Sequence, residues 1–214
     1  IKASFNLAVK WKLIYENPCK DLKQYKIDEK EILCFPDEEI ALLINSIDDI
    51  KLQRIVKFAL YSGCRISETI NLEWKDLDFN ERVIFIRNKE GFATKSGKIR
   101  KIPFANKTLE IITEMQNEKS KVVNINYDYL FTNKNGVKYD RSRLTRQFKF
   151  YIRKIGLSEK FHFHCLRHTF ITNLIKAGVN INFVKELAGH SDINTTMNYI
   201  HIVTEDLREA VNKI

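Results

Sequence analysis

Glycine, proline and cysteine are all scarce in this sequence, and the few cysteines are scattered. The 214 residues include 7 glycines and 3 prolines, which argues against low-complexity linkers and fits a mainly helical globular body. The four cysteines form no C-x-x-C pair and no cluster with histidine. Structural zinc and a disulfide framework are therefore disfavoured, and a cytoplasmic location is expected. No apolar run approaches the length of a membrane span, and no signal-peptide pattern opens the chain.

Positive charge is in excess. Lysine and arginine number 36 against 27 aspartates and glutamates, which gives a net charge of +9. Such a balance favours a polyanionic partner, with nucleic acid first and a membrane surface second. Charge alone does not decide between them, because many solvated helix faces are rich in lysine. The length suffices for one well-buried core and a small appendage.

The hydrophobic pattern predicts a mainly α fold with a small antiparallel β-sheet. Residues 1–16 form a helical stripe that Asn17-Pro18 stops, and the charged, aperiodic stretch 17–35 is interpreted as a linker. Pro36 opens the main body, residues 36–214, with a helix whose first turn is acidic. A short helix is expected to carry Arg65, and two strands are expected at 82–87 and 99–104. Further helices are predicted at 51–62, 106–118, 140–155, 164–177, 181–188, 192–199 and 204–213.

The stretch from His164 to His168 opens one of these helices. His164 and Arg167 are three residues apart and share a face in the first turn. Unpaired backbone amides there favour an anion, and a guanidinium can bind two phosphate oxygens at once. This pattern predicts a phosphate site. The alternative is a solvated helix end with His168 paired to backbone.

Three further segments carry groups that can do chemistry. Glu68 lies three residues after Arg65 and can orient it, although such pairs are usually surface ion pairs. Lys95 lies on a turn with a glycine and could protonate a leaving group, or could be a solvated hairpin lysine. Tyr199 lies nine residues after His190, on a helix that Ser191 can cap. Its phenol becomes a nucleophile only where cations or a base assist it.

These segments together resemble the tyrosine recombinase (phage integrase) family, and its Xer-like members in particular. The resemblance rests on Gly-Cys-Arg-Ile-Ser-Glu at 63–68, Thr-Lys-Ser-Gly-Lys at 94–98 and His-Cys-Leu-Arg-His-Thr-Phe at 164–170. It also rests on the run from Ala188 to Tyr199, and it covers roughly residues 36–210. It implies the catalytic-domain fold of that family. Residues 1–16 resemble the last helix of the family's N-terminal core-binding domain, so we expect this chain to be a fragment of a longer protein.

The resemblance implies a nucleophile and a phosphate clamp. Tyr199 would attack the scissile phosphate of DNA, leaving a 3′-phosphotyrosyl link and a free 5′-hydroxyl. Arg65 and Arg167 would bind the non-bridging oxygens, and His190 would add a third donor.

It also implies roles for three other residues. Lys95 would protonate the departing 5′-oxygen, His164 would assist proton transfer from the tyrosine, and Glu68 would support Arg65. No cofactor and no metal is expected, because the ester energy is kept in the protein–DNA bond.

The function implied is that of a site-specific recombinase acting on double-stranded DNA. We expect a monomer in solution, a homotetramer on its recombination site, and a location on the nucleoid. Two alternatives stay open, a non-catalytic DNA-binding module of the same fold and a type IB topoisomerase. The helix at 204–213 is expected to pack either on a neighbouring protomer or on its own domain.

Overall fold

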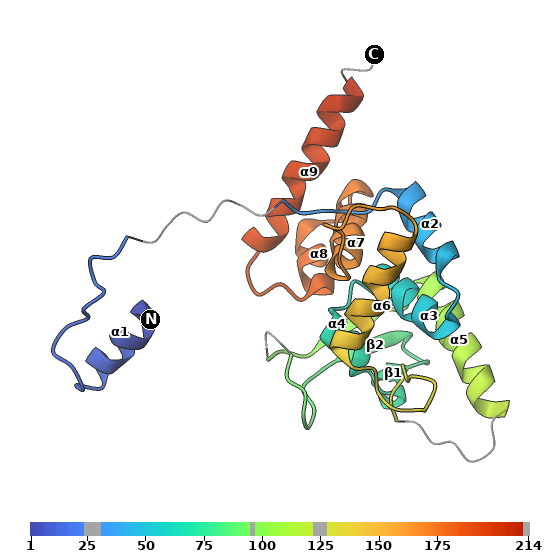
Figure 1. The fold of residues 1–214 in the computed structure, drawn as a ribbon, viewed down its shortest axis with the longest axis horizontal. Coiled ribbons are helices and arrows are strands. Elements are labelled where there is room, and N and C mark those ends of the chain that lie inside the picture. Colours follow the sequence, from blue (N-terminus) through green and yellow to red (C-terminus); the bar gives the residue numbers. More distant parts are fainter. Residues whose placement is uncertain (24–30, 95–96, 122–127, 212–214) are drawn as a thin grey trace. The chain divides into compact units, whose positions relative to one another are not determined.

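The chain comprises two units, Ile1–Glu31 and Ile32–Ile214 (Figure 1). A computed structural model describes residues 1–23, 31–94, 97–121 and 128–211. The second unit begins at Ile32, so residues 32–35, which the sequence assigned to the linker, belong to it. The backbone amide of Phe35 donates to Thr169 Oγ1 at 2.8 Å, and the Phe35 side chain is buried.

The first unit contains one helix, α1 (Lys2–Lys10), among its described residues. It ends six residues earlier than the end predicted at Glu16. The reason is local, because Lys12 adopts a left-handed conformation with φ of 57°. The backbone amides of Lys12 and Leu13 donate to the carbonyls of Val9 and Ala8 in the last helical turn. Such hydrogen bonds are typical of a helix that ends at a residue in the left-handed conformation.

Eight α-helices make up most of the described part of the second unit. They are α2 (Asp37–Ser46), α3 (Ile50–Ser62), α4 (Ile66–Ile70), α5 (Asn106–Lys121), α6 (Arg141–Lys154), α7 (His164–Lys176), α8 (Ile181–Ala188) and α9 (Asn194–Val211). The bounds of α3, α5, α6, α7 and α8 agree with the predicted ranges to within three residues, and Arg65, expected on a short helix, is the residue directly before α4.

Capping residues explain why several of these helices start and stop where they do. Asp49 accepts from the backbone amides of Lys51 and Leu52 at the start of α3, and Gly63 ends that helix with φ of 64°. Asn180 caps α8 in the same way, and Gly189 ends it with φ of 65°.

The sheet has three antiparallel strands in the order β1-β2-β3, preceded by the short 3₁₀ helix η1 (Trp74–Asp76). β2 (Val83–Ile86) and β3 (Arg100–Pro103) are the two predicted strands, and Ile84 pairs with Ile102 between them. β1 (Leu77–Asp78) was not predicted. The prediction of a mainly α fold with a small antiparallel sheet is confirmed.

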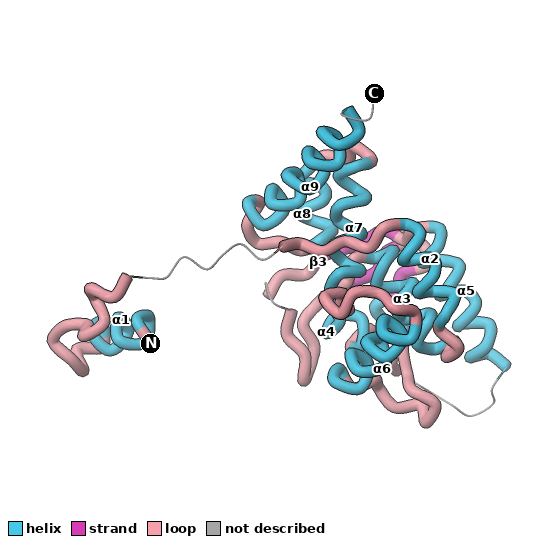
Figure 2. The backbone as a smooth tube through the Cα atoms, turned by 45° about the horizontal axis from the view of Figure 1, so that its top comes forward, coloured by secondary structure: helices cyan, strands magenta, loops and turns pink. Residues whose placement is uncertain are grey.

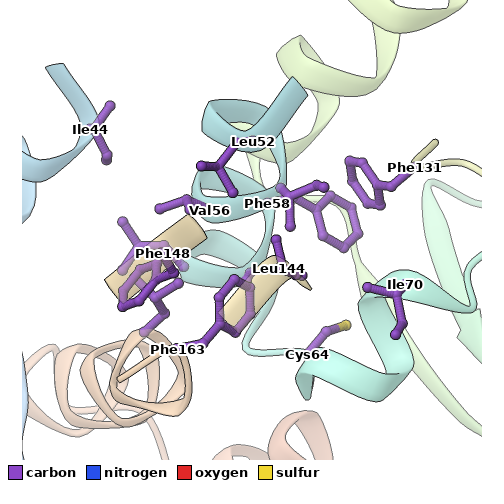
Figure 3. Close-up of a cluster of buried hydrophobic side chains, with 14 of the residues drawn as sticks. Ile44, Leu52, Val56, Phe58, Cys64, Ile70, Phe131, Leu144, Phe148 and Phe163 are labelled. Atoms are coloured by element: carbon purple, nitrogen blue, oxygen red, sulfur yellow. The ribbon is translucent and has the colours of Figure 1, made fainter. Parts of the chain in front are cut away.

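The main core is built around α3. This helix packs against α2, α4, α5 and α7, and Leu52, Val56 and Phe58 on it are inaccessible to solvent. Figure 3 shows Val56 close to Phe148 of α6, and Phe58 next to Phe131. The rings of Phe148 and Phe163 meet edge to face at 5.4 Å. Because α3 is held on several sides, its C-terminal end is a fixed point on which a site can be built.

A second, smaller core joins α7, α8 and α9, which lie together in Figure 2. It is formed by Ile171, Val184, Ala188 and Tyr199, all buried. α8 also packs against β3. The two clusters share α7, which therefore connects the end of α3 to the residues of α9.

Helix α9 differs from the prediction of two helices at 192–199 and 204–213. It is one continuous helix, since Ile200 to Val203 contain no glycine or proline to interrupt it. It begins at Asn194, whose amide donates to Asp192 Oδ1 at 3.0 Å. Ser191, the predicted cap, lies three residues before the start. No helix among the described residues is long and apolar enough to span a membrane.

Candidate active site

Arg167 lies between the ends of two other helices. It is 1% exposed. Its Nη1 donates to the carbonyl of Gly63 at 2.7 Å, and its Nη2 donates to the carbonyl of Ala188. Gly63 ends α3 and Ala188 ends α8, where carbonyls lack intrahelical partners and carry partial negative charge. Burial, with the nearby charge of Arg65, lowers the pKa of Arg167 to about 10, so it remains charged at neutral pH.

Glu68 holds two arginines at once. The Arg65 amide donates to its Oε2 at 2.7 Å and the Arg65 Nη1 to its Oε1 at 2.9 Å. Arg100, from β3, adds a bidentate pair at 2.9 and 2.7 Å. Burial pushes the pKa of Glu68 upward, but these hydrogen bonds and charges outweigh it and lower the pKa to about 2. The predicted support of Arg65 by Glu68 is thus present as a buried network rather than a surface pair.

Tyr199 lies in the second turn of α9, with 3% of its surface exposed. Its hydroxyl lies 2.6 Å from Nδ1 of His168 on α7. Its ring stacks on the His190 ring, with centroids 6.2 Å apart. Burial raises the pKa of Tyr199 to about 12, against the opposing effect of Arg167. The phenol is therefore protonated at neutral pH.

The two predicted histidines approach the same region from different elements. His164 is the first residue of α7, and its ring meets the His168 ring edge to face at 4.7 Å. His190 follows the glycine that ends α8, and its Nδ1 lies 2.9 Å from Thr196 Oγ1. Burial, with the charge of Arg167, lowers the pKa of His164 to about 4 and that of His190 to about 3. Both rings are neutral at pH 7.

The turn after α8 completes the cluster. Nη2 of Arg65 donates to the carbonyl of Gly189 at 3.0 Å, one residue from the Ala188 carbonyl that Arg167 contacts. Five predicted catalytic residues and the supporting Glu68 thus come together from the start of α4, from α7 and α9, and from this turn. The five are Arg65, His164, Arg167, His190 and Tyr199. Two guanidinium groups beside neutral imidazoles and a phenol suit an anion with several oxygens, such as a phosphate.

The sequence profile of the phage integrase family matches residues 30–206. This chain belongs to the phage integrase family. A tyrosine recombinase of Thermosipho africanus is 31% identical over 206 residues, which cover 94% of this chain and 69% of the relative. The tyrosine recombinase XerA of Pyrococcus furiosus is 32% identical over 197 residues, which cover 90% of this chain and 65% of the length of that XerA. The resemblance identified in the sequence is confirmed.

Solved structures of the phage integrase family have the same fold. The integrase of the transposon Tn1549, in complex with a circular intermediate DNA, matches with a TM-score of 0.74 and 26% identity. That match covers 92% of this chain and 71% of the integrase. The XerA recombinase crystal structure matches with a TM-score of 0.71 and 27% identity, over 100% of this chain and 76% of XerA. The expected catalytic-domain fold is confirmed.

Arg100 was not predicted to belong to this cluster. It lies close to Lys95 in the sequence, between Lys98 and Lys101, and no motif distinguishes it from these lysines. One signal was available, because side chains two residues apart in a strand share a face. Ile102 is buried on β3, so Arg100 faces the same way and requires a carboxylate partner. Glu68 is that partner.

His168 was also missed, since it entered the prediction only as a backbone-paired residue in the alternative to the phosphate site. It lies four residues after His164, so a helix places the two imidazoles on one face. That spacing was the available signal. The structure pairs His168 with the Tyr199 hydroxyl, where the sequence had assigned His164 to assist the tyrosine.

Lys95 lies outside the described residues. Thr94, directly before it, is anchored by its amide to Asn88 Oδ1 at 2.8 Å. Within the described ranges, no three histidine, cysteine, aspartate or glutamate side chains are grouped as metal ligands would be.

Proposed function

We propose that this chain is the catalytic part of a site-specific DNA recombinase that cleaves and rejoins strands through a phosphotyrosine at Tyr199. The observation that supports it most directly is the position of the Tyr199 ring, beside His190 and His168 and under the influence of Arg167 and Arg65. A phenol in such surroundings has a proton acceptor and cations for the anion it would attack. Membership of the phage integrase family agrees with this assignment.

In the proposed reaction Arg65 and Arg167 bind the non-bridging oxygens of the scissile phosphate. Each guanidinium has five N–H donors, so each can hold a carbonyl and an oxygen of the phosphate together. His190 adds a third donor. His190 Nδ1 lies 2.9 Å from the Thr196 hydroxyl. We assign the Nδ1 as the acceptor of that contact, which places the ring proton on Nε2 and makes it available to the phosphate. Donors fixed before the reaction stabilise developing charge without reorganisation, and one donor is typically worth about 3 kcal/mol.

The leaving group requires a proton of its own. We assign that role to Lys95, which would protonate the departing 5′-oxygen. Glu68 fixes Arg65, and His164 stands beside His168 at the start of α7. The bond energy of the broken diester is stored in the Tyr199 phosphoester, so religation to a new strand requires neither ATP nor metal.

The proposed partner is double-stranded DNA carrying a specific recombination site. The net charge of +9 and the exposed basic side chains of α6 fit a polyanion. The Tn1549 integrase, similar in fold, is described in complex with DNA. The proposal includes a monomer in solution and a homotetramer on DNA.

The test is a covalent trap on nicked duplexes. The 214-residue chain is incubated without metal on a library of nicked duplexes of randomised sequence, and adducts that survive denaturation are recovered and sequenced. We expect adducts from the wild type and none from Tyr199→Phe. Tyr139→Phe is the matched control, because Tyr139 is equally buried, at 3% exposure, and its pKa is also raised to about 12.

Each other outcome selects an alternative. DNA binding with no adduct from any duplex would contradict the proposal and favour a binding module. Adducts without sequence preference, together with relaxation of supercoiled DNA, would favour a type IB topoisomerase. Adducts that persist in Tyr199→Phe would exclude Tyr199 as the nucleophile.

A further inference from the structure

We propose that His168, rather than His164, is the base that accepts the phenolic proton of Tyr199 during strand cleavage. The assignment rests on the proposed function and on one contact, the 2.6 Å separation between His168 Nδ1 and the Tyr199 hydroxyl. A base must lie within hydrogen-bond reach of the proton it removes, about 2.6–3.2 Å between heavy atoms. His168 meets that requirement, and both partners are held on packed helices.

The packing around this contact leaves His164 in a different place. α7 and α9 pack directly on each other, and the rings of His168 and Tyr199 lie 5.6 Å apart between centroids. His164 lies one turn earlier on α7, and its ring meets the His168 ring at 87° and 4.7 Å. His164 therefore contacts the group that contacts the nucleophile. Its effect on the phenol is transmitted through His168.

The charged and titratable groups facing His168 come from two helices and the segment before α7. His164 and Arg167 belong to its own helix, His162 lies just before it, and Tyr199 faces it from α9. Burial first, and then these neighbours, lower the pKa of His168 to about 3. The ring is neutral at pH 7. Its proton is placed on Nε2 in this proposal, which leaves the Nδ1 lone pair facing the phenol.

Substrate binding makes this weak base stronger. A phosphate held by Arg65 and Arg167 brings negative charge next to Arg167, whose positive charge opposes protonation of His168. The pKa of His168 therefore rises when DNA is bound. Proton transfer also coincides with nucleophilic attack, so a free phenolate, with its pKa of about 12, never accumulates.

The step balances as follows. The O–H bond of Tyr199 breaks and its proton moves to Nδ1 of His168, while the phenolic oxygen forms a bond to phosphorus. The bond from phosphorus to the 5′-oxygen breaks, and that oxygen takes a proton from the separate acid assigned to Lys95. In religation the 5′-hydroxyl oxygen attacks phosphorus and its proton returns to the amine assigned to Lys95. The bond from phosphorus to the Tyr199 oxygen breaks, and His168 returns its proton to the departing phenolate.

The variant that separates proton acceptance from positioning is His168→Asn. The Asn Oδ1 occupies nearly the place of Nδ1 and can still accept a hydrogen bond from the phenol, but an amide cannot take up the proton. His164→Asn is the comparison. His162→Asn is the matched control, since the Nδ1 of His162 contacts Cys165 Sγ at 2.9 Å in the same cluster. Thermal melting verifies that each variant is folded, and gel shift measures its DNA affinity.

The readout is the single-turnover rate of adduct formation from pH 6 to pH 10, on a nicked duplex that the wild type cleaves. We expect His168→Asn to be slower at pH 7 by about 10²–10⁴-fold, the usual contribution of a general base, with unchanged DNA affinity. The deficit should shrink toward pH 10, where hydroxide can remove the phenolic proton. His162→Asn should follow the wild-type profile, and His164→Asn should lose less than His168→Asn.

Three results would overturn the assignment. Cleavage by His168→Asn at the wild-type rate would remove any role in proton transfer, and faster cleavage would make the contact a restraint on Tyr199 instead. A larger, pH-sensitive deficit in His164→Asn than in His168→Asn would give the role to His164. An absence of adduct from the wild type would instead remove the proposed function itself, so the two failures are distinguishable.

Discussion

At the scale of single residues, the charge of Glu68 decides whether two partly buried arginines can be held in the site. Arg65 and Arg100 both contact its carboxylate, which is 2% exposed. Taking a guanidinium out of water costs several kcal/mol unless a counter-charge and hydrogen bonds compensate. Because the pKa of Glu68 is lowered to about 2, the carboxylate keeps its charge over the whole physiological range.

This predicts that Glu68→Gln is strongly destabilising although it changes the shape very little. The amide would leave two partly buried guanidinium groups without their counter-charge, and breaking a buried pair costs about 3–5 kcal/mol. Urea unfolding of the variant and the wild type measures the difference. Glu159→Gln, which removes the exposed partner of Arg153, is the control and should leave the unfolding midpoint nearly unchanged. Equal shifts in the two variants would contradict a charged network at Glu68.

The sequence could predict part of this arrangement but not all of it. Residues three apart on a helical turn must be neighbours, so the pair of Arg65 and Glu68 was accessible from spacing. The choice between His164 and His168 was not, because both lie on one face of α7. Which of them reaches Tyr199 depends on where α9 crosses α7, and that crossing is a property of tertiary packing.

At the scale of elements, the turn after α8 joins three parts of the site. Gly189 is left-handed, and a Cβ added there would lie 2.8 Å from Nη1 of Arg100. The Arg100 side chain cannot easily give way, because it holds Glu68 with two hydrogen bonds and the carbonyl of Leu187 with a third. The close approach of β3 to α8 therefore depends on glycine.

We predict that Gly189→Ala is more damaging than Gly178→Ala. Both positions have positive φ, so both variants incur the left-handed penalty of roughly 1–2 kcal/mol. Gly178 has open space where a Cβ would be, so its variant reports that penalty alone. Gly189→Ala adds overpacking, typically about 1–3 kcal/mol, and should also slow adduct formation, because Arg65 is bonded to the Gly189 carbonyl. Urea unfolding and the covalent trap, applied to both variants, measure the two effects. Indistinguishable variants would show that β3 and α8 can separate without cost.

Element boundaries followed the sequence where a local signal existed. α8 begins and ends at the predicted residues, because Asn180 caps it and Gly189 terminates it. β1 has two residues and is defined only by its pairing with β2, which no periodicity can reveal in so short a segment. The continuity of α9 was missed because an interruption was expected where the sequence contains no helix breaker.

At the scale of the whole molecule, three partly buried histidines make the stability of this domain depend on pH. Burial lowers the pKa of His164 to about 4, and those of His168 and His190 to about 3. In the unfolded chain each titrates near 6.5. Below that pH the unfolded state binds protons that the folded state does not, so stability must fall as pH falls. Glu68 acts in the same direction but in a lower window, between its unfolded value near 4.3 and about 2.

The prediction is a decrease in the thermal midpoint between pH 7.5 and pH 5, a range in which the histidines titrate in the unfolded chain and Glu68 does not. His168→Asn removes one of the three sites, so its stability should depend on pH less steeply, by the equivalent of one proton. Glu159→Gln, altered on the surface, should keep the wild-type slope. Calorimetry at half-unit intervals of pH gives these slopes directly. A midpoint that is constant over this range, or a slope unaltered in His168→Asn, would mean that the folded domain accommodates charged imidazoles. The neutral His168 required for proton acceptance would then lose its physical basis.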